Sequence, residues 1–199
     1  MNSREDGELM LAAGQGDREA FATLVQRHQR AIIHFVHRFL GTANRDIAED
    51  LVQEVFLEAW RHAPCFRPRA KVLTWLLRIT TNDCLNYRRS NRLRRTAPFD
   101  ADATAGHPGP GSEPAEARAM ARERADRVRR AIACLPANQR AAMLLRHFQG
   151  LSYVEIADVL GTSVSAVEAL LFRGRQTLRG TLAAENDASP QVSPEPGVE

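Results

Sequence analysis

Apolar residues return every three or four positions along the first half of the chain, from Asp17 to about Arg95. Side chains with that spacing lie on one face of an α-helix, so the pattern predicts amphipathic helices. Asp17 is the expected N-cap of the first of them, because an aspartate can accept hydrogen bonds from the free amides of a first turn. The apolar positions that follow it are Phe21, Leu24, Val25, Ile32, Phe35, Val36 and Phe39.

Two more helices are predicted in this half. One begins near Asp46 and continues to Trp60, and the other runs from about Val72 to Asn91. Prolines punctuate the loop between them, APCFRPRAK, because proline lacks the amide hydrogen that a helix interior uses. No segment alternates between apolar and polar residues for long enough to predict a strand, so the expected fold class is all-α.

The helical pattern stops in the middle of the chain and then resumes. Residues 96–114 are rich in Pro, Gly, Ala and acidic residues, a composition that cannot bury enough apolar surface to fold alone. Helical spacing returns over 115–182, and the last residues, 183–199, are again Pro-rich and acidic. We therefore predict two small helical domains, 1–95 and 115–182, with a flexible acidic linker between them and a disordered tail.

The second domain contains the pattern of a helix-turn-helix. Ser152 and Glu155 have the spacing of a capping box that opens a short helix. Ala157 then supplies the small residue that lets two helices approach, Gly161 supplies the turn, and Val167 supplies a buried aliphatic side chain. This combination predicts a DNA-binding module.

The helix that begins at Val164 has two different faces at 100° per residue. Its core face contains Val167, Leu170, Leu171, Gly174 and Leu178. Its outer face contains Ser165, Glu168, Ala169, Phe172, Arg173 and Gln176. Such side chains can bond base edges or phosphates or contact a thymine methyl, so this face is expected to lie on duplex DNA. The alternatives are a solvated face with one exposed Phe, and a helix hairpin that packs only on protein.

Charge adds a second candidate surface. The net charge is +3, and arginine supplies all of the basic residues except Lys71. From Arg61 to Arg95 the only acidic residue is Asp83, and aromatic residues lie among the basic ones. Basic and aromatic side chains together are typical of surfaces that hold single-stranded nucleic acid. Trp75 is expected in the core, and Phe66, in the loop, is the expected base contact.

The helix from Asp46 to Trp60 carries a third candidate surface. Leu57 and Trp60 lie among acidic and amide residues on the side opposite its core face. Apolar residues on a polar face favour a protein-binding surface.

Three segments together resemble regions two and four of bacterial extracytoplasmic-function sigma factors. They are DIAEDLVQEVFLEAWRH, then FRPRAKVLTWLLRITTNDCLNYRR, then LPANQRAAMLLRHFQGLSYVEIADVLGTSVSAVEALLFRGRQTLR. The resemblance implies promoter recognition by a dissociable subunit of RNA polymerase, monomeric when free. Its implied partners are core polymerase, promoter DNA and an anti-sigma factor. The implied contacts on core polymerase are the coiled coil of its largest subunit and its flap. The linker would run through the polymerase.

The resemblance also implies roles for individual residues. Core polymerase would contact Asp50, Leu51, Gln53, Glu54, Leu57 and Trp60. The melted minus-10 element would contact Phe66, Arg67, Arg69, Lys71, Asn82, Arg88 and Arg89. The minus-35 element would contact the outer face of the helix from Val164. Glu168 and Ala169 depart from the Arg and small polar residue that family members often have there, so the promoter sequence does not carry over.

Two other functions are weighed against this one. A helix-turn-helix regulator that binds duplex DNA by itself would dimerise on palindromic sites and would need neither the Leu57 face nor the basic loop. An enzyme is disfavoured, because no catalytic set is recognisable and His34 and His37 lack the further ligands of a metal site. A polymerase decoy is a third possibility if the DNA face is inert. We expect no cofactor and no metal.

The compartment follows from cysteine usage and from the ends of the chain. The three cysteines, Cys65, Cys84 and Cys134, are isolated and form no metal-binding pattern. The N-terminus lacks a signal-type apolar core, and no run reaches membrane-spanning length. We therefore expect a reduced, cytoplasmic protein without membrane insertion, whose thiols are structural unless Cys65 or Cys84 responds to oxidation.

Overall fold

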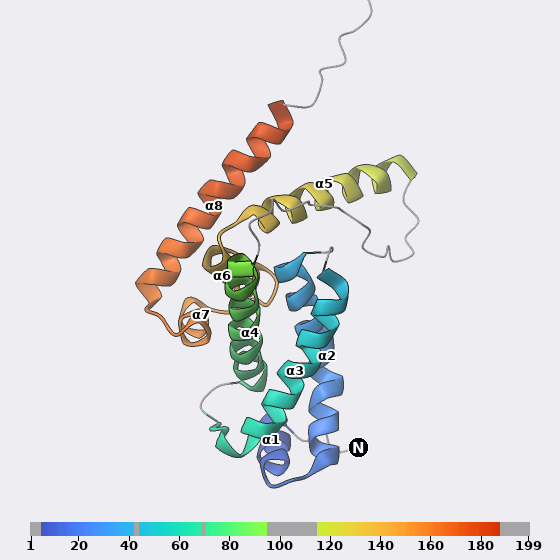
Figure 1. Cartoon of the computed structure of the whole chain (residues 1–199), viewed down its shortest axis with the longest axis vertical. Helices are drawn as coiled ribbons and strands as arrows, with labels where there is room; N and C mark the ends of the chain where they lie inside the picture. The colour runs from blue at the N-terminus through green and yellow to red at the C-terminus, as the bar shows by residue number, and fades with distance from the viewer. Residues whose placement is uncertain (1–4, 42–43, 69–70, 95–114, 188–199) are drawn as a thin grey trace, which may run out of the picture.

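The computed structural model describes residues 5–41, 44–68, 71–94 and 115–187. Within these ranges the regular structure consists of α-helices and one short 3₁₀ turn (Figure 1), so the predicted all-α class is confirmed. The predicted linker at 96–114 lies outside the described residues, and so does Arg69.

The N-terminal group contains α1 to α4 and the turn η2. Its elements are α1 (Asp6–Gly14), α2 (Arg18–Leu40), α3 (Arg45–His62), η2 (Ala63–Cys65) and α4 (Val72–Arg94). The Asp17 cap is confirmed, since its carboxylate accepts from the amides of Glu19 and Ala20 at 3.0 Å. The helix boundaries agree with the predicted ones to within three residues.

The sequence pattern did not predict α1. This helix buries Leu9 and Met10 against the rest of the group. The helix ends at Gly14. A Cβ atom on residue 14 would lie 2.9 Å from the carbonyl oxygen of Ala63, so only glycine allows α1 to approach η2 this closely. The helix has only nine residues, and that length is too short for periodicity to predict it well.

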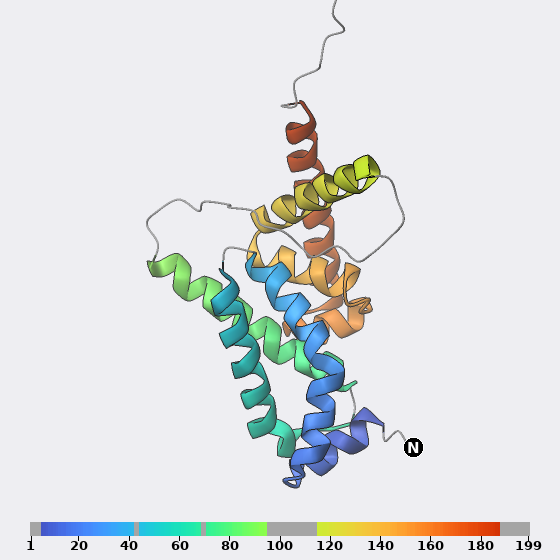
Figure 2. The ribbon, with the colours of Figure 1, turned by 90° about the vertical axis from the view of Figure 1, so that its right-hand side faces the viewer.

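The C-terminal group contains α5 to α8. Its elements are α5 (Ala115–Cys134), α6 (Ala137–His147), α7 (Tyr153–Leu160) and α8 (Val164–Asp187). The last helix continues to Asp187, whereas the sequence pattern placed its end near Leu182. The end of α8 extends past the other helices in two perpendicular views (Figures 1 and 2).

The two groups pack against each other, which the sequence analysis did not predict. The helix α4 lies between α2 and α3 on one side and α6 and α7 on the other (Figure 1). The buried apolar residues of both groups form one continuous cluster. A polar contact crosses the boundary as well, because the buried Arg140 of α6 donates to the carbonyl of Phe39 in α2 at 2.6 Å.

Two features are absent from the part of the chain that the structure describes. None of its helices combines the length and the apolar character that crossing a membrane requires. No cluster of three or more His, Cys, Asp or Glu residues suitable for a metal ion occurs among the same residues.

Candidate protein-binding and nucleic-acid-binding surfaces

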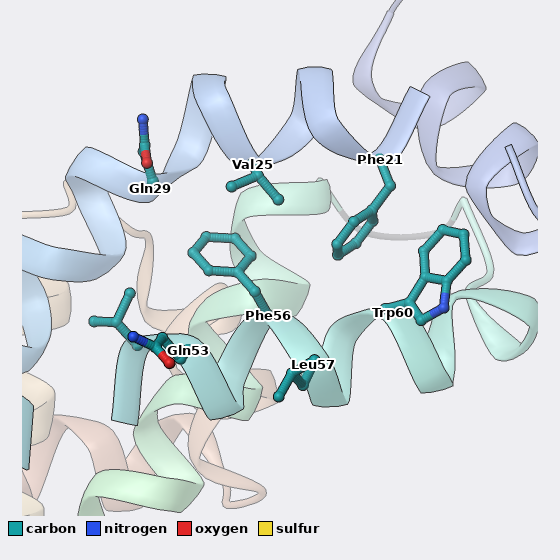
Figure 3. Close-up of a pocket in the computed structure, with 8 residues that line it drawn as sticks. Phe21, Val25, Gln29, Gln53, Phe56, Leu57 and Trp60 are labelled. Carbon is teal, nitrogen blue, oxygen red and sulfur yellow. The ribbon is translucent and has the colours of Figure 1, made fainter. Parts of the chain in front are cut away.

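An apolar groove of about 480 Å³ lies between α2 and α3. Figure 3 shows Phe21 and Val25 of α2 facing Phe56 and Trp60 of α3. The rings of Phe21 and Trp60 meet edge to face, with centroids 5.1 Å apart. Gln29, Val52, Gln53 and Leu57 complete the lining.

Three of the predicted residues of α3, Gln53, Leu57 and Trp60, line this groove. Leu57 is 51% exposed and lines the groove, so it extends an apolar patch that is open to a partner. Asp50, Gln53 and Glu54 are also exposed, while Leu51 and Trp60 are half-buried. Glu54 pairs with Arg61 at 3.2 Å, so part of the acidic charge is already neutralised.

The contribution of α2 to the groove was missed by the sequence analysis. The pattern placed Phe21 and Val25 only among the apolar positions of this helix, and both are half-buried and line the open groove. Their spacing of four residues and the polar Gln29 one turn later are the signal that could have placed this strip at the edge of the core. Periodicity shows that a residue is on the apolar face, but not whether a neighbour covers it.

The ring of Phe66, the predicted base contact, is buried in this structure. Phe66 is only 2% exposed and packs edge to face against Trp75, with ring centroids 5.7 Å apart. Trp75, which was expected in the core, is half-buried. A short 3₁₀ turn before Phe66 directs the chain so that the ring points inward, and that turn was not predicted. In this arrangement the ring contributes to the core and is not presented to a nucleic acid.

The basic side chains after η2 lie at the surface. Arg67 is exposed and donates to the carbonyl of Phe66 at 3.3 Å. Lys71 is also exposed, and its ammonium lies 3.4 Å from the carboxylate of Glu155 in α7. This pair joins the predicted minus-10 loop to the helix-turn-helix.

The predicted residues of α4 differ in their exposure. Asn82 and Arg89 are exposed and can reach a nucleic acid. Arg88 is half-buried, and burial lowers the pKa of its guanidinium. Burial also raises the pKa of Asp83 to about 6, with smaller contributions from the negative charges of Glu58 and Glu54.

The cysteines differ in accessibility. Cys84 is buried in α4, and burial raises the pKa of its thiol. Cys65 and Cys134 are exposed. A thiol that is both buried and hard to ionise is a structural one, as expected for Cys84.

The helix-turn-helix has the predicted construction. The amide of Ser152 donates to the Glu155 carboxylate at 2.8 Å, and the amide of Glu155 donates back to the Ser152 hydroxyl at 3.2 Å. These bonds from Ser152 lower the pKa of the Glu155 carboxyl. Gly161 ends α7 in the left-handed conformation, with a φ of 60°, and Ala157 and Val167 are buried between the two helices.

The outer face of α8 is open to solvent as predicted. Phe172 is 56% exposed, and Ser165, Glu168, Arg173 and Gln176 are also exposed. Ala169 is half-buried at the margin of this face. On the opposite face a Cβ atom at Gly174 would lie 3.0 Å from Cγ of Met143, so the glycine accommodates that side chain.

An exposed polar and aromatic face on the second helix of a capped helix-turn-helix defines a helical DNA-binding protein. Comparison with known families specifies the class. Residues 24–94 match the model of sigma-70 region 2, and residues 125–178 match the model of sigma-70 region 4. The chain belongs to the extracytoplasmic-function (ECF) family of RNA polymerase sigma factors.

Individual relatives agree with this family. The ECF RNA polymerase sigma factor SigM of Mycobacterium tuberculosis is 35% identical over 185 residues, which cover 93% of this chain and 88% of that protein. The solved structure of CnrH in complex with the cytosolic domain of CnrY matches 93% of this chain and 99% of its own, with a TM-score of 0.62 and 29% identity. The sigma factor RpoE of Bartonella quintana, solved with the anti-sigma factor NepR, shares the fold at a TM-score of 0.63 and 23% identity, over 83% of this chain and 98% of its own.

Proposed function

We propose that this chain binds core RNA polymerase and reads promoter DNA with three separate surfaces, on α3, α4 and α8. Membership of the sigma-factor family makes it a subunit that directs RNA polymerase to promoters. One observation carries the assignment of core binding: the exposed side chain of Leu57 lines an open apolar groove. The residues of this groove differ from those of the basic loop and of the helix-turn-helix.

The groove between α2 and α3 is the proposed site for core polymerase. An apolar groove bordered by Gln53 and Glu54 suits a helical partner that brings apolar and basic side chains. The coiled coil of the largest polymerase subunit is the partner that the family resemblance implies. Leu57 would supply the central apolar contact.

The basic loop and α4 are the proposed minus-10 surface. Arg67, Lys71, Asn82 and Arg89 are exposed there and can contact phosphates or base edges. Phe66 leaves this set because it is buried. The outer face of α8 is the proposed minus-35 reader, with Phe172 and Arg173 in the major groove and Glu168 selecting among sequences.

The remaining features of the proposal concern regulation and location. We expect an anti-sigma factor that covers the polymerase-binding groove, and the flap of the polymerase as a second contact. The chain would act in the cytoplasm as a monomer and would catalyse no reaction by itself.

Substitution of Leu57 by Asp tests the core-binding surface. The charge would lie in the apolar contact and should abolish co-elution with purified core RNA polymerase, or weaken it at least about a hundredfold, since burial of an unpaired charge costs several kcal/mol. The readouts are co-elution and transcription from genomic DNA in vitro.

The matched control is Leu11→Asp in α1. Leu11 is 47% exposed, nearly the same as Leu57, but lies outside the groove. This variant should bind core polymerase as the parent does. Equal binding by both variants, or specific footprints on duplex promoters by the chain alone, would favour a self-sufficient helix-turn-helix regulator.

A further inference from the structure

The outer face of α8 carries positive charge that extends toward the end of the helix. Phe172, Arg175 and Arg179 are spaced by three and four residues, so they lie along one side of the helix and form what we call the arginine strip. All three side chains are exposed. Among the described residues, neither Arg175 nor Arg179 forms an ion pair. The charge of the strip is therefore open to an anionic partner.

The surroundings of the strip favour an anion that approaches from the end of the helix. Glu168 is the only acidic residue between Val164 and Leu182. Arg175 lies two turns beyond it, or about 10 Å along the helix axis, so an anion on the strip avoids most of its repulsion. In Figures 1 and 2 the last turns of α8 extend past the other helices, so the strip can be reached from that end.

The sequence that follows α8 has the opposite charge. Residues 188–199, which lie outside the described ranges, read ASPQVSPEPGVE and contain Glu195 and Glu199 but no Lys or Arg. Prolines such as theirs favour the extended polyproline II conformation, which advances about 3.1 Å per residue. A segment that is already extended loses less conformational entropy when it binds. The segment is thus a chemical complement to the arginine strip.

The lengths of the two segments also agree. From the end of α8 back to Arg179 the helix covers eight residues, and back to Arg175 it covers twelve, which are about 12 Å and 18 Å. If the chain reverses over residues 188–191, Glu195 lies about 12 Å and Glu199 about 25 Å along an extended segment. Glu195 then comes level with Arg179. Glu199 passes Arg175 by about 7 Å, a distance that an arginine side chain spans.

An apolar contact is available in the same register. Val198 lies about 22 Å along the extended segment, and Phe172 lies about 22 Å from the end of α8. Phe172 is 56% exposed, so Val198 would cover part of its ring. The segment therefore matches the strip in charge and in apolar character.

We propose that in the free chain residues 188–199 fold back along α8, that Glu195 and Glu199 pair with Arg179 and Arg175, and that the docked segment competes with duplex DNA for this face. The competition with DNA rests on the proposed function, which assigns the outer face of α8 to the minus-35 element. Each ion pair is weak by itself because it is exposed to water. The short covalent connection compensates, since it gives the segment an effective concentration in the millimolar range.

Competition of this kind lowers the affinity of the face for every duplex by the same factor. Non-specific DNA is held mainly through phosphate contacts, and the lowered affinity would leave it largely unbound. A matched minus-35 element adds base contacts, which keep it bound. The segment would therefore restrict α8 to DNA that it can read.

Substitution of both glutamates by glutamine tests the competition. Glu195→Gln with Glu199→Gln removes the charge and keeps the size of the side chains. In the full chain it should raise the affinity for a random-sequence duplex of about 20 base pairs about threefold to tenfold, the effect of releasing two exposed ion pairs. Fluorescence anisotropy at about 50 mM salt is the measurement, since higher salt screens the pairs.

The matched control is Glu8→Gln with Glu19→Gln. Both residues are exposed in the N-terminal group, so the control loses the same two charges outside the C-terminal group. Its affinity for the duplex should rise by less than about twofold, because distant charges are screened. An equal gain in both double variants would assign the effect to net charge and would overturn the proposal.

Paramagnetic relaxation measures the docking itself, without DNA. A spin label is attached to Ser165→Cys at the start of α8, after Cys65→Ser and Cys134→Ser remove the two exposed thiols. The buried Cys84 stays unlabelled. The label is 22 residues, or about 33 Å, from the end of α8, so a segment that points away from the helix is little affected.

The docked segment brings Gly197 and Val198 to within about 10 Å of the label along the helix axis. Their amide signals should lose most of their intensity in the labelled parent. They should recover it when Glu195 and Glu199 are replaced by glutamine. Arg175→Gln with Arg179→Gln, on the other side of the contact, should restore the signals as well.

A mixed sample identifies which chain supplies the segment. Spin-labelled chains are combined with isotope-labelled chains that carry no spin label, so only contacts between two molecules reduce the signals. The signals of Gly197 and Val198 should keep their intensity in this mixture. Their loss would show that a second copy occupies the strip and would overturn the proposal.

Two further outcomes would also overturn it. They are full signal intensity in the labelled parent, and equal affinity for the duplex in the parent and the Glu195→Gln, Glu199→Gln variant. Absence of duplex binding by every variant would instead overturn the assignment of α8 to DNA. The relaxation measurement would then still decide whether the segment docks on the arginine strip.

Discussion

At the scale of single residues, burial decides which side chains can act on a partner. Phe66 is buried although its loop position predicted a surface side chain, and Trp75 is half-buried and packs against the Phe66 ring. Leu57 and Phe172 are exposed, whereas leucine and phenylalanine side chains are most often buried. Exposed apolar residues of this kind are the ones that a binding partner can cover.

Glu168 is the residue of α8 that we expect to set promoter choice. It is exposed on the outer face one turn before Phe172, where a carboxylate can accept from a cytosine or orient a neighbouring arginine. Glu168→Arg should change which promoters are transcribed in vitro and leave co-elution with polymerase intact. Start-site mapping on genomic DNA is the measurement, and an unchanged set of promoters would contradict the prediction.

Asp83 should make stability depend on pH. Its pKa is raised from 3.8 to about 6 by burial beside Glu58 and Glu54, so the folded state binds the proton more tightly than the unfolded state. The stabilising contribution of the protonated form is present below pH 3.8 and is lost as the pH rises through about 6. Asp83→Asn should therefore stabilise the chain at pH 7.5 by about 1 to 2 kcal/mol, after a discount for partial solvent access.

The measurement for Asp83 is urea unfolding of parent and variant at pH 4, 5.5 and 7.5. The stability gain should shrink as the pH falls. Asp158→Asn, at an exposed position of α7, is the control and should show no such trend. A gain for Asp83→Asn that is equal at all three pH values would contradict the explanation.

At the scale of elements, the helix-turn-helix depends on backbone geometry as much as on side chains. Ser152 and Glu155 satisfy each other's free amides at the start of α7, and Gly161 turns the chain toward α8 with a positive φ. These are local requirements, and for that reason the sequence alone predicts this module well. The short α1 and η2 have no such local signature and were not predicted.

Gly161 should be intolerant of a side chain. Alanine in the left-handed conformation is strained, so Gly161→Ala should lower the free energy of unfolding by about 1 to 2 kcal/mol. Gly180 is the matched control, because it lies inside α8 with open space where a Cβ would be placed. Gly180→Ala should raise stability by about 0.5 to 1 kcal/mol. Thermal unfolding followed by circular dichroism distinguishes the two, and equal effects would contradict the prediction.

At the scale of the whole molecule, the sequence predicts the helices but not their assembly. Periodicity shows one apolar face on each helix, yet it does not say which of the other helices covers that face. The packing of α6 on α2 depends on contacts between residues about a hundred positions apart, such as Arg140 and Phe39. The same limit explains why the α2 side of the groove was missed, since Phe21 and Trp60 meet only in three dimensions.

The hydrogen bond from Arg140 to the Phe39 carbonyl at the end of α2 affects how fragments of the chain are expected to behave. The segments that match the two family models, 24–94 and 125–178, leave out α1 and contribute residues to one buried apolar cluster. A fragment that stops before residue 95 would lack α6, so the Phe39 carbonyl would lose the guanidinium of Arg140 and the ring of Phe39 would lose part of its cover. Truncated forms of this protein should therefore aggregate more readily than the full chain, and their behaviour should not be taken to represent its parts.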